Sequence, residues 1–140
     1  SKEHSWRDVG YGFDALRVPR YIIRDKPVNE IITKFQLTPN ILRTPANFWY
    51  KWHLDKDRSA AINVELYSEH SHTVYGSDAE HGNKNNIEEL VYEEAGMYLL
   101  NTQLSHSVLN LGGPRYVLTL GFKYPDTYDL VKDFCISNNY

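Results

Sequence analysis

The sequence has only one cysteine, Cys135, so the chain cannot form an internal disulfide, and a disulfide-stapled fold is excluded. It also lacks any apolar run approaching the roughly 18 residues that span a bilayer, and it lacks a charged-then-apolar leader. It has no excess of positive charge either, since 15 Lys and Arg against 18 Asp and Glu give a net charge of −3. We therefore expect a protein of the cytoplasm with no membrane segment and no nucleic-acid partner.

The composition is that of a folded domain rich in tyrosine. The 140 residues are 41% hydrophobic and 24% charged, a balance that excludes a disordered chain. This length suits one domain, because two independent cores would each be small. Aromatic residues make up 14% of the chain, and 11 of them are Tyr, which favours strands and a cleft with amphipathic walls over a helical bundle.

Hydrophobic periodicity predicts short strands between two helices. After a short strand at 21–24, Asp25 caps an amphipathic helix that ends near Phe35. A second helix spans 126–135, with Asp126 as its N-cap. Strand-like runs lie between them, at 48–53, 60–67, 72–75, 90–92, 97–102, 106–109 and 115–122. Runs of this length, separated by turn signals, predict a mainly β barrel or sandwich with one or two flanking helices.

The longest loop signal covers 76–86, which is polar and rich in Gly and Asn. One interpretation is a hairpin connection. The other is a flap over a binding site, because loops carry binding groups on a rigid scaffold.

His and Asp, which bind metals, and Arg, which binds anions, occur in or next to the predicted strands. His53 and Asp55 form an H-x-D triplet whose side chains point to the same side of a strand, about 7 Å apart. The triplet alone is a weak signal, and a His and an Asp at the surface end of a strand explain it equally well. His106 lies in a later strand, where a packed core histidine is the alternative to a ligand.

Arg115 follows His106 by nine residues, across the turn at 112–114. If the two flanking strands pair, both side chains project into one interior. Burial of an arginine there costs desolvation free energy unless the guanidinium binds an anion. The alternative is that Arg115 caps the barrel rim or pairs with a carboxylate such as Glu65.

Two His and one carboxylate on one face, with open positions, form the facial triad of non-haem Fe(II) oxygenases. The stretch 52–55, Trp-His-Leu-Asp, followed by Arg58, Ala60, Ala61 and Asn63, resembles the first metal motif of the Fe(II)/2-oxoglutarate-dependent dioxygenases. The stretch 100–102, Leu-Asn-Thr, followed by His106-Ser107-Val108, Asn110 and Arg115, resembles the second. The resemblance covers about residues 45–122 and is closest to the aspartyl/asparaginyl β-hydroxylase-like branch.

This resemblance implies a double-stranded β-helix, a jelly-roll, cupin-like barrel, over a single domain of residues 1–140. It implies that His53, Asp55 and His106 are the catalytic ligands of Fe(II). It also implies that Arg115 holds the distal carboxylate of 2-oxoglutarate, with Asn63 as a weaker polar contact. The expected activity consumes O2 and 2-oxoglutarate and hydroxylates an unidentified substrate, which is a protein Asp or Asn side chain, an amino acid or a small metabolite.

One position departs from the family pattern. Some members carry Ser two residues after the arginine, where this chain has Val117. Another polar side chain then has to contact the cosubstrate, and the candidates are Thr119, Tyr50 and Tyr67.

Two other interpretations stay open at the level of sequence. His70 and His72 form an H-x-H pair, as in cupin metal sites, although Gly76 and Ser77 stand where cupins have an acid. A cupin-like metal enzyme or small-molecule binder without 2-oxoglutarate is therefore the alternative function. A third hypothesis is a binding module in which the triad side chains do not converge.

Overall fold

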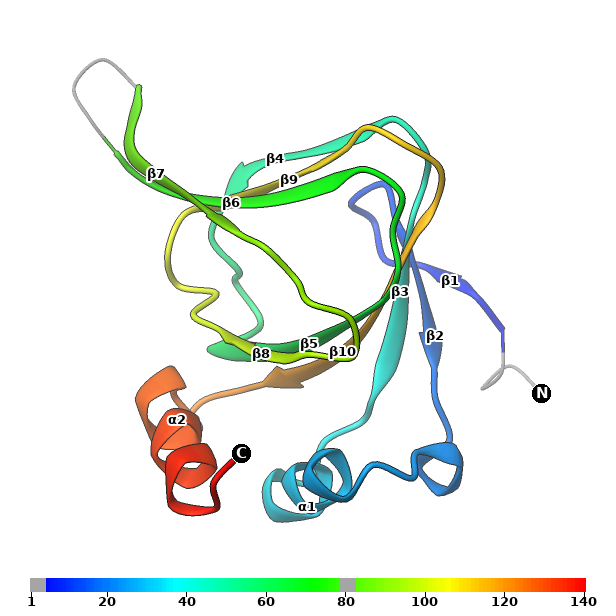
Figure 1. The fold of residues 1–140 in the computed structure, drawn as a ribbon, viewed down its shortest axis with the longest axis vertical. Coiled ribbons are helices and arrows are strands. Elements are labelled where there is room, and N and C mark those ends of the chain that lie inside the picture. The colour runs from blue at the N-terminus through cyan, green and yellow to red at the C-terminus, as the bar shows by residue number, and fades with distance from the viewer. Residues whose placement is uncertain (1–4, 79–82) are drawn as a thin grey trace.

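Two antiparallel β-sheets face each other in this computed structural model, which describes residues 5–78 and 83–140 (Figure 1). The larger sheet has the order β1-β2-β3-β10-β5-β8, and the smaller has the order β4-β9-β6-β7. The strands of the larger sheet are β1 (Arg7–Asp8), β2 (Asp14–Arg17), β3 (Asn40–Thr44), β10 (Arg115–Phe122), β5 (Ala60–Tyr67) and β8 (Met97–Leu100). Those of the smaller sheet are β4 (Phe48–His53), β9 (His106–Asn110), β6 (Ser71–Asp78) and β7 (Lys84–Leu90).

Two helices, α1 (Lys26–Phe35) and α2 (Tyr128–Ser137), lie beside the larger sheet (Figure 1). The Asp25 side chain caps α1 by accepting a hydrogen bond from the backbone N–H of Val28, as its position before the apolar pattern predicts. The buried residues of both helices form one hydrophobic cluster with β5 and β10, and their packing stabilises the fold. This cluster consists of Val28, Ile31, Ile32, Ala60, Ile62, Leu120, Phe122 and Val131.

The strand β10 separates this hydrophobic cluster from a polar interior. Leu120 and Phe122 belong to the cluster on the helix side. Because side chains alternate along a strand, Arg115, Val117 and Thr119 point to the other face, between the two sheets. All three are buried. The space between the sheets therefore contains charged and hydroxyl groups, which is unusual for a core and favours a binding site there.

The mainly β prediction is confirmed, and three local predictions are wrong. The expected strand at 21–24 is a 3₁₀ turn at Arg20–Ile22, where the N–H of Ile22 bonds to the carbonyl of Pro19. The second helix begins at Tyr128, because the Thr127 side chain rather than that of Asp126 accepts from its first turn. The run at 90–92 is not a strand of its own, since β7 already ends at Leu90.

The segment 76–86 is mostly hairpin and not loop. β6 continues to Asp78 and β7 starts at Lys84, and the two strands pair antiparallel. Residues 79–82 lie outside the described residues.

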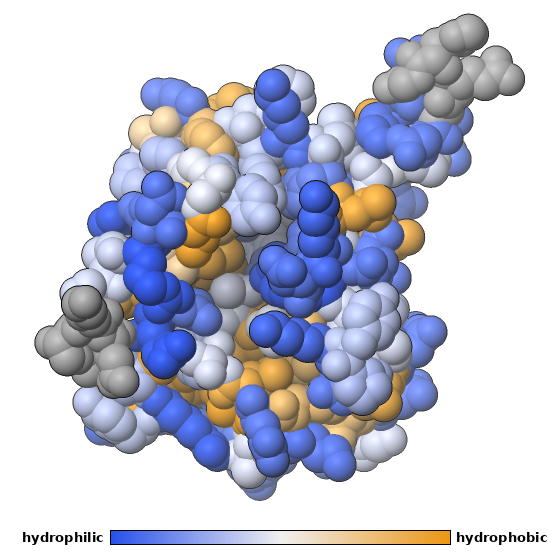
Figure 2. Space-filling model, turned by 180° about the vertical axis from the view of Figure 1, so that it is seen from behind, coloured by the Kyte–Doolittle hydropathy of each residue, from blue (hydrophilic) through white to orange (hydrophobic). Residues whose placement is uncertain are grey.

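On the face opposite to that of Figure 1, hydrophobic residues gather in the lower central part and hydrophilic residues surround them (Figure 2). In the described ranges 5–78 and 83–140, no helix has both the length and the apolar character needed to cross a membrane.

Candidate metal centre

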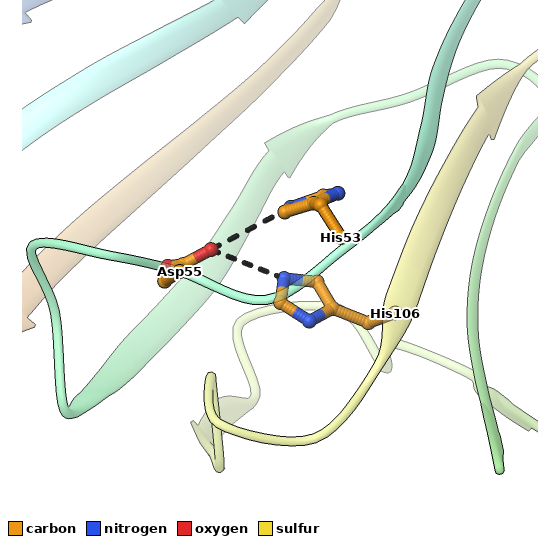
Figure 3. A group of neighbouring side chains, drawn as sticks. All are labelled: His53, Asp55 and His106. Carbon is orange, nitrogen blue, oxygen red and sulfur yellow. Dashed lines mark ion pairs between the residues drawn. The ribbon is translucent and has the colours of Figure 1, made fainter. Parts of the chain in front are cut away.

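His53, Asp55 and His106 lie together between the two sheets (Figure 3). Their nearest nitrogen and oxygen atoms are all within 4.8 Å of one another. Oδ1 of Asp55 is 3.5 Å from Nε2 of His53 and 3.4 Å from Nε2 of His106. Among the residues that the structure describes, this is the only group of three or more His, Cys, Asp and Glu side chains with such spacing.

Strand pairing brings the two histidines together although 53 positions separate them in the chain. β4 and β9 are antiparallel neighbours, and His53 is the register partner of His106. The register shifts between Tyr50 and His53, so the end of β4 is irregular. Asp55 lies just past that end, where its backbone N–H donates to the carbonyl of Thr102. The backbone at Asp55 is therefore held by the chain segment that leads to His106.

Backbone carbonyls determine which nitrogen of each imidazole faces the centre. The Nδ1 atom of His53 lies in hydrogen-bond contact with the Lys51 carbonyl, and that of His106 lies 2.7 Å from the Leu104 carbonyl. A carbonyl only accepts, so each Nδ1 carries a hydrogen and each Nε2 faces Asp55. A protonated Nε2 donates a hydrogen bond to the carboxylate, and an unprotonated Nε2 offers its lone pair to a cation that lies between these atoms. This arrangement of imidazoles is the usual one for histidines that bind metals.

The Asp55 carboxyl group is held in its ionised form. Burial by itself raises its pKa, but hydrogen bonds from His106 and His53 and the positive charge of Arg58 outweigh burial, and the pKa lies well below its usual range. A carboxylate and two neutral imidazoles are ligands that suit Fe(II), Mn(II) and Zn(II), and two ligands about 2.0–2.2 Å from one ion lie about 3–4 Å apart. The donor set therefore fits a divalent metal ion.

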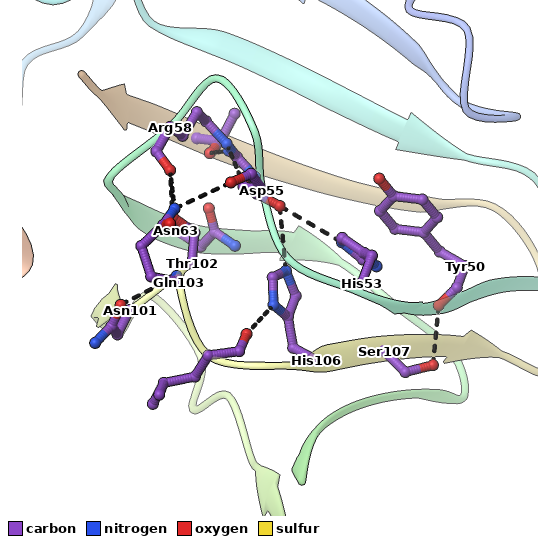
Figure 4. Close-up of polar contacts among 12 residues, drawn as sticks. Tyr50, His53, Asp55, Arg58, Asn63, Asn101, Thr102, Gln103, His106 and Ser107 are labelled. Atoms are coloured by element: carbon purple, nitrogen blue, oxygen red, sulfur yellow. Dashed lines mark hydrogen bonds and ion pairs between the residues drawn. The ribbon is translucent and has the colours of Figure 1, made fainter. Parts of the chain in front are cut away.

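Arg58 binds the oxygen of Asp55 that does not face the histidines. Its Nε donates to Oδ2 of Asp55 at 2.7 Å and its Nη2 forms an ion pair with the same oxygen at 2.6 Å, which leaves Oδ1 toward the histidines (Figure 4). Its Nη1 donates to Oγ1 of Thr119 at 3.2 Å. Gly121 makes room for this side chain, because a Cβ there would lie 2.8 Å from Cδ of Arg58.

The backbone of Arg58 is held by the turn before β9. Its carbonyl accepts hydrogen bonds from Oγ1 of Thr102 at 2.8 Å and from Nε2 of Gln103 at 2.7 Å. In the sequence, Arg58 is only one residue of the stretch that resembles the first metal motif. Its role depends on contacts with Thr119 and Gln103, which no local pattern reveals.

Arg115 and Asn63 share the inner face of the larger sheet but lie outside the three-residue group. Arg115 is 6% exposed, and its Nε lies 3.3 Å from Oε2 of Glu65. The pairing with Glu65 is the alternative that the sequence left open. Asn63 is the register partner of Thr119, and its Nδ2 donates to the Tyr92 hydroxyl at 3.2 Å. The guanidinium of Arg115 also lies over the Tyr92 ring.

Four buried side-chain oxygen atoms have no hydrogen-bond partner among the described residues, and two of them lie near the centre. They are Oδ1 of Asn63, the register partner of Thr119, and the hydroxyl of Tyr75, whose ring stacks on His106 at 5.5 Å. Burial is the first cause that raises the pKa of the Tyr75 hydroxyl, so it stays protonated. Unpartnered buried polar atoms are rare in proteins and are typical of a place where a ligand or water binds. No sequence pattern identifies Tyr75 as a site residue.

The other polar candidates have different surroundings. Tyr67 is half exposed, and its hydroxyl donates to Glu69, so it points away from the interior. Thr119 receives the Arg58 bond described above. Tyr50 packs its ring 3.8 Å from that of His53, and burial, followed by the charge of Asp55, raises the pKa of Tyr50 to about 12.

His70 and His72 are not part of the centre. Nδ1 of His72 lies 2.6 Å from a carboxylate oxygen of Glu89, and its ring contacts that of His70. On β6, Thr73 and Tyr75 pair in register with Val108 and His106, so the adjacent His72 faces the opposite side of the smaller sheet.

No model of a protein family matches this sequence, and no curated protein matches it. Solved structures do match the fold. A prolyl-4-hydroxylase from Pseudomonas putida superposes with a TM-score of 0.57 at 13% identity, over 84% of this chain and 77% of that one. Drosophila melanogaster CENP-C bound to CAL1 gives a TM-score of 0.53 at 10% identity, over 86% and 82%.

Hydroxypropylphosphonic acid epoxidase from S. wedmorenis gives a TM-score of 0.52 at 13% identity, over 86% of this chain and 56% of that one. At such low identity, the likeness shows the fold alone. The chain is therefore a mainly β, cupin-like jelly roll of two antiparallel sheets with two flanking helices, a fold that it shares with a hydroxylase and an epoxidase.

Proposed function

We propose that this chain is an Fe(II)-dependent oxygenase that uses 2-oxoglutarate and O2 to hydroxylate a second substrate. In this proposal residues 1–140 act as one double-stranded β-helix domain of the aspartyl/asparaginyl β-hydroxylase-like branch. The observation that carries it is the convergence of two Nε2 atoms and Oδ1 of Asp55, with both Nδ1 atoms directed at backbone carbonyls.

His53, Asp55 and His106 are the residues that would hold the iron. Bound there, Fe(II) supplies the activation of O2, which no protein side chain can perform. Three protein ligands on one side leave positions for other ligands. Arg58 occupies the second oxygen of Asp55, so that the carboxylate presents one oxygen to the centre.

The interior between the sheets supports a cosubstrate site. Arg115 offers a guanidinium in a mostly dry environment, where a carboxylate binds through charge-assisted hydrogen bonds. Asn63 and Tyr75 each offer a polar atom that has no hydrogen-bond partner within residues 5–78 and 83–140. The rings of Tyr50 and Tyr75 pack against His53 and His106 and limit the access of water to the metal ligands.

A second candidate function is a metal-dependent oxygenase or cupin-like enzyme that does not use 2-oxoglutarate. The observation that favours it is the ion pair between Arg115 and Glu65, because a guanidinium that already holds a carboxylate has less to offer to a second one. The inward position of the triad does not separate the two candidates, since both need the metal.

The test is an anaerobic titration of the purified protein with Fe(II) and then 2-oxoglutarate, followed by the visible metal-to-ligand absorbance. Succinate formation under air with ascorbate is the second readout. The His106→Ala variant is expected to lose both signals, and Arg115→Ala is expected to need a much higher 2-oxoglutarate concentration. His70→Ala, which changes a histidine outside the centre, is the matched control and should behave like the wild type.

The outcomes separate the two candidates. If the wild type binds Fe(II) but shows neither absorbance nor succinate, the 2-oxoglutarate assignment is wrong and the second candidate replaces it. If His106→Ala binds Fe(II) as tightly as the wild type, the metal assignment itself is wrong.

A further inference from the structure

A large cleft opens directly beside the metal centre. It encloses about 1050 Å³, and His53, Asp55 and Arg58 form part of its lining. Its other walls come from β1, β2 and β3 of the larger sheet, from β4 of the smaller one and from the end of β10. This volume is at the upper end of the range for small-molecule sites, so the cleft has room for a substrate next to the metal ligands.

Aromatic rings line the route from the outside of the cleft to His53. Tyr11, which is half exposed, stacks on Phe13 at 6.2 Å, and Phe13 packs edge-on against Tyr50 at 5.4 Å. Tyr50 in turn touches the His53 ring at 3.8 Å. Such a series of rings provides a flat apolar surface for the uncharged part of a ligand.

Two arginines, Arg7 and Arg17, line this cleft from the inner face of the larger sheet. The register places Arg17 opposite Asn40 and Asn40 opposite Thr119, so these three side chains share the inner face. Arg7 is the partner of Ala15 and donates from Nη2 to Oδ1 of Asn40 at 3.0 Å. Within the described part of the chain, neither Arg7 nor Arg17 has an ion pair with a carboxylate.

The charge of the cleft is opposite to that of the whole chain. Six basic residues line it: Arg7, Arg17, Lys51, Lys56, Arg58 and Lys123. Three acidic residues line it: Asp55, Asp57 and Asp126. The balance is therefore 6 − 3 = +3 in a chain whose net charge is −3. A positive cleft in an acidic protein attracts and orients anionic ligands.

We propose that this cleft binds an anionic substrate of low molecular weight, with its carboxylate or phosphate on Arg7 and Arg17 and an apolar or aromatic portion along Tyr11, Phe13 and Tyr50. The inference rests on the proposed function, because it takes the centre at His53 and Asp55 as the place of reaction. Thr119 touches Arg58, and the backbone of Arg17 lies two strands further across the sheet, about 10 Å from that of Thr119. The arginines and the metal ligands therefore line the same cleft, with room between them for the body of a substrate.

The proposal is tested by direct binding to the metal-free protein, so that a carboxylate cannot bind through a metal. The probes are 2-naphthylacetate, 2-naphthyl phosphate and the neutral 2-naphthylacetamide, each titrated by calorimetry at low and at moderate salt. At low salt, at least one anion is expected to bind about tenfold more tightly than the amide, and the added salt should reduce this preference. The better of the two anions identifies the acid group.

The double variant Arg7→Gln/Arg17→Gln is expected to lose the preference for the anion while it still binds the amide. Arg24→Gln removes the same charge from an exposed residue that does not line the cleft, and it should leave the preference unchanged. The proposal is overturned if the amide binds as tightly as both anions, or if the double variant keeps the preference. These measurements involve no iron and no turnover, so they fail or succeed independently of the succinate assay.

Discussion

Replacing Glu65 with Gln removes the negative charge beside Arg115 and nearly preserves the shape of the side chain. Nε of Arg115 lies 3.3 Å from Oε2 of Glu65, and the two side chains are 7% and 22% exposed. Two unit charges about 4 Å apart attract each other by about 4 kcal/mol at an effective dielectric constant of about 20. A cosubstrate carboxylate that binds Arg115 has to compete with this attraction.

Only part of that attraction becomes available to the cosubstrate. The incoming carboxylate loses its own hydration, and the Gln side chain still accepts a hydrogen bond from Arg115. We therefore expect Glu65→Gln to strengthen 2-oxoglutarate binding by about 1.4 kcal/mol, which is about tenfold in Kd. In the absence of cosubstrate, the same change leaves a buried guanidinium without a counter-charge, and we expect the free energy of unfolding to fall by about 1–3 kcal/mol.

Both effects are measurable on one set of samples. Calorimetry of the Mn(II)-loaded protein gives the Kd of 2-oxoglutarate, and thermal unfolding with and without 2-oxoglutarate gives the stability. The cosubstrate should raise the Tm of Glu65→Gln more than that of the wild type, because it restores the missing counter-charge. Glu30→Gln, on the surface of α1, is the matched control.

The reasoning is refuted if Glu65→Gln binds 2-oxoglutarate more weakly than the wild type. In that case Glu65 holds Arg115 in the conformation that binds and does not compete with the ligand. If neither protein binds 2-oxoglutarate, the oxygenase without this cosubstrate is the better assignment.

Three further predictions concern the centre and its surroundings. Gly121→Ala should weaken metal binding by about tenfold, because the added Cβ displaces the arginine that holds Asp55; an unchanged metal Kd would show that this support is dispensable. Tyr75→Phe should leave the free energy of unfolding unchanged or raise it by up to about 1 kcal/mol, since the hydroxyl has no partner among the residues that the structure describes. The same change should weaken 2-oxoglutarate binding, and a loss of stability would contradict this reasoning. In the metal-free protein, Asp55 stabilises the fold above its unfolded-state pKa of 3.8, and this contribution is lost as the pH falls below that value, because its folded-state pKa is lower. Urea unfolding should therefore show a difference between wild type and Asp55→Asn that shrinks from pH 5 to pH 3, and a difference that grows would be incompatible with a lowered pKa.

Local patterns were sufficient for most of the secondary structure. The spacing of Val28, Ile31 and Ile32 after Asp25 predicted α1, because a cap and an apolar face act within one or two turns. The strand-like runs at 60–67 and 115–122 predicted β5 and β10 with the observed bounds. The pattern failed at 21–24, where Pro19 starts a turn in a run that is apolar enough for a strand.

The chain's own sequence determined that two histidines, a carboxylate and an arginine occupy strands or strand ends of a mainly β fold. Only the tertiary structure determines which side chains these residues contact. His53 faces His106 because β4 pairs with β9, and Arg115 meets Glu65 because β10 pairs with β5. Likewise, Arg17 lies in the cleft because β2 and β3 extend the same sheet. The physical reason is that alternation along a strand fixes which side chains share a face, whereas the choice of neighbouring strand depends on contacts between segments that are far apart in the chain.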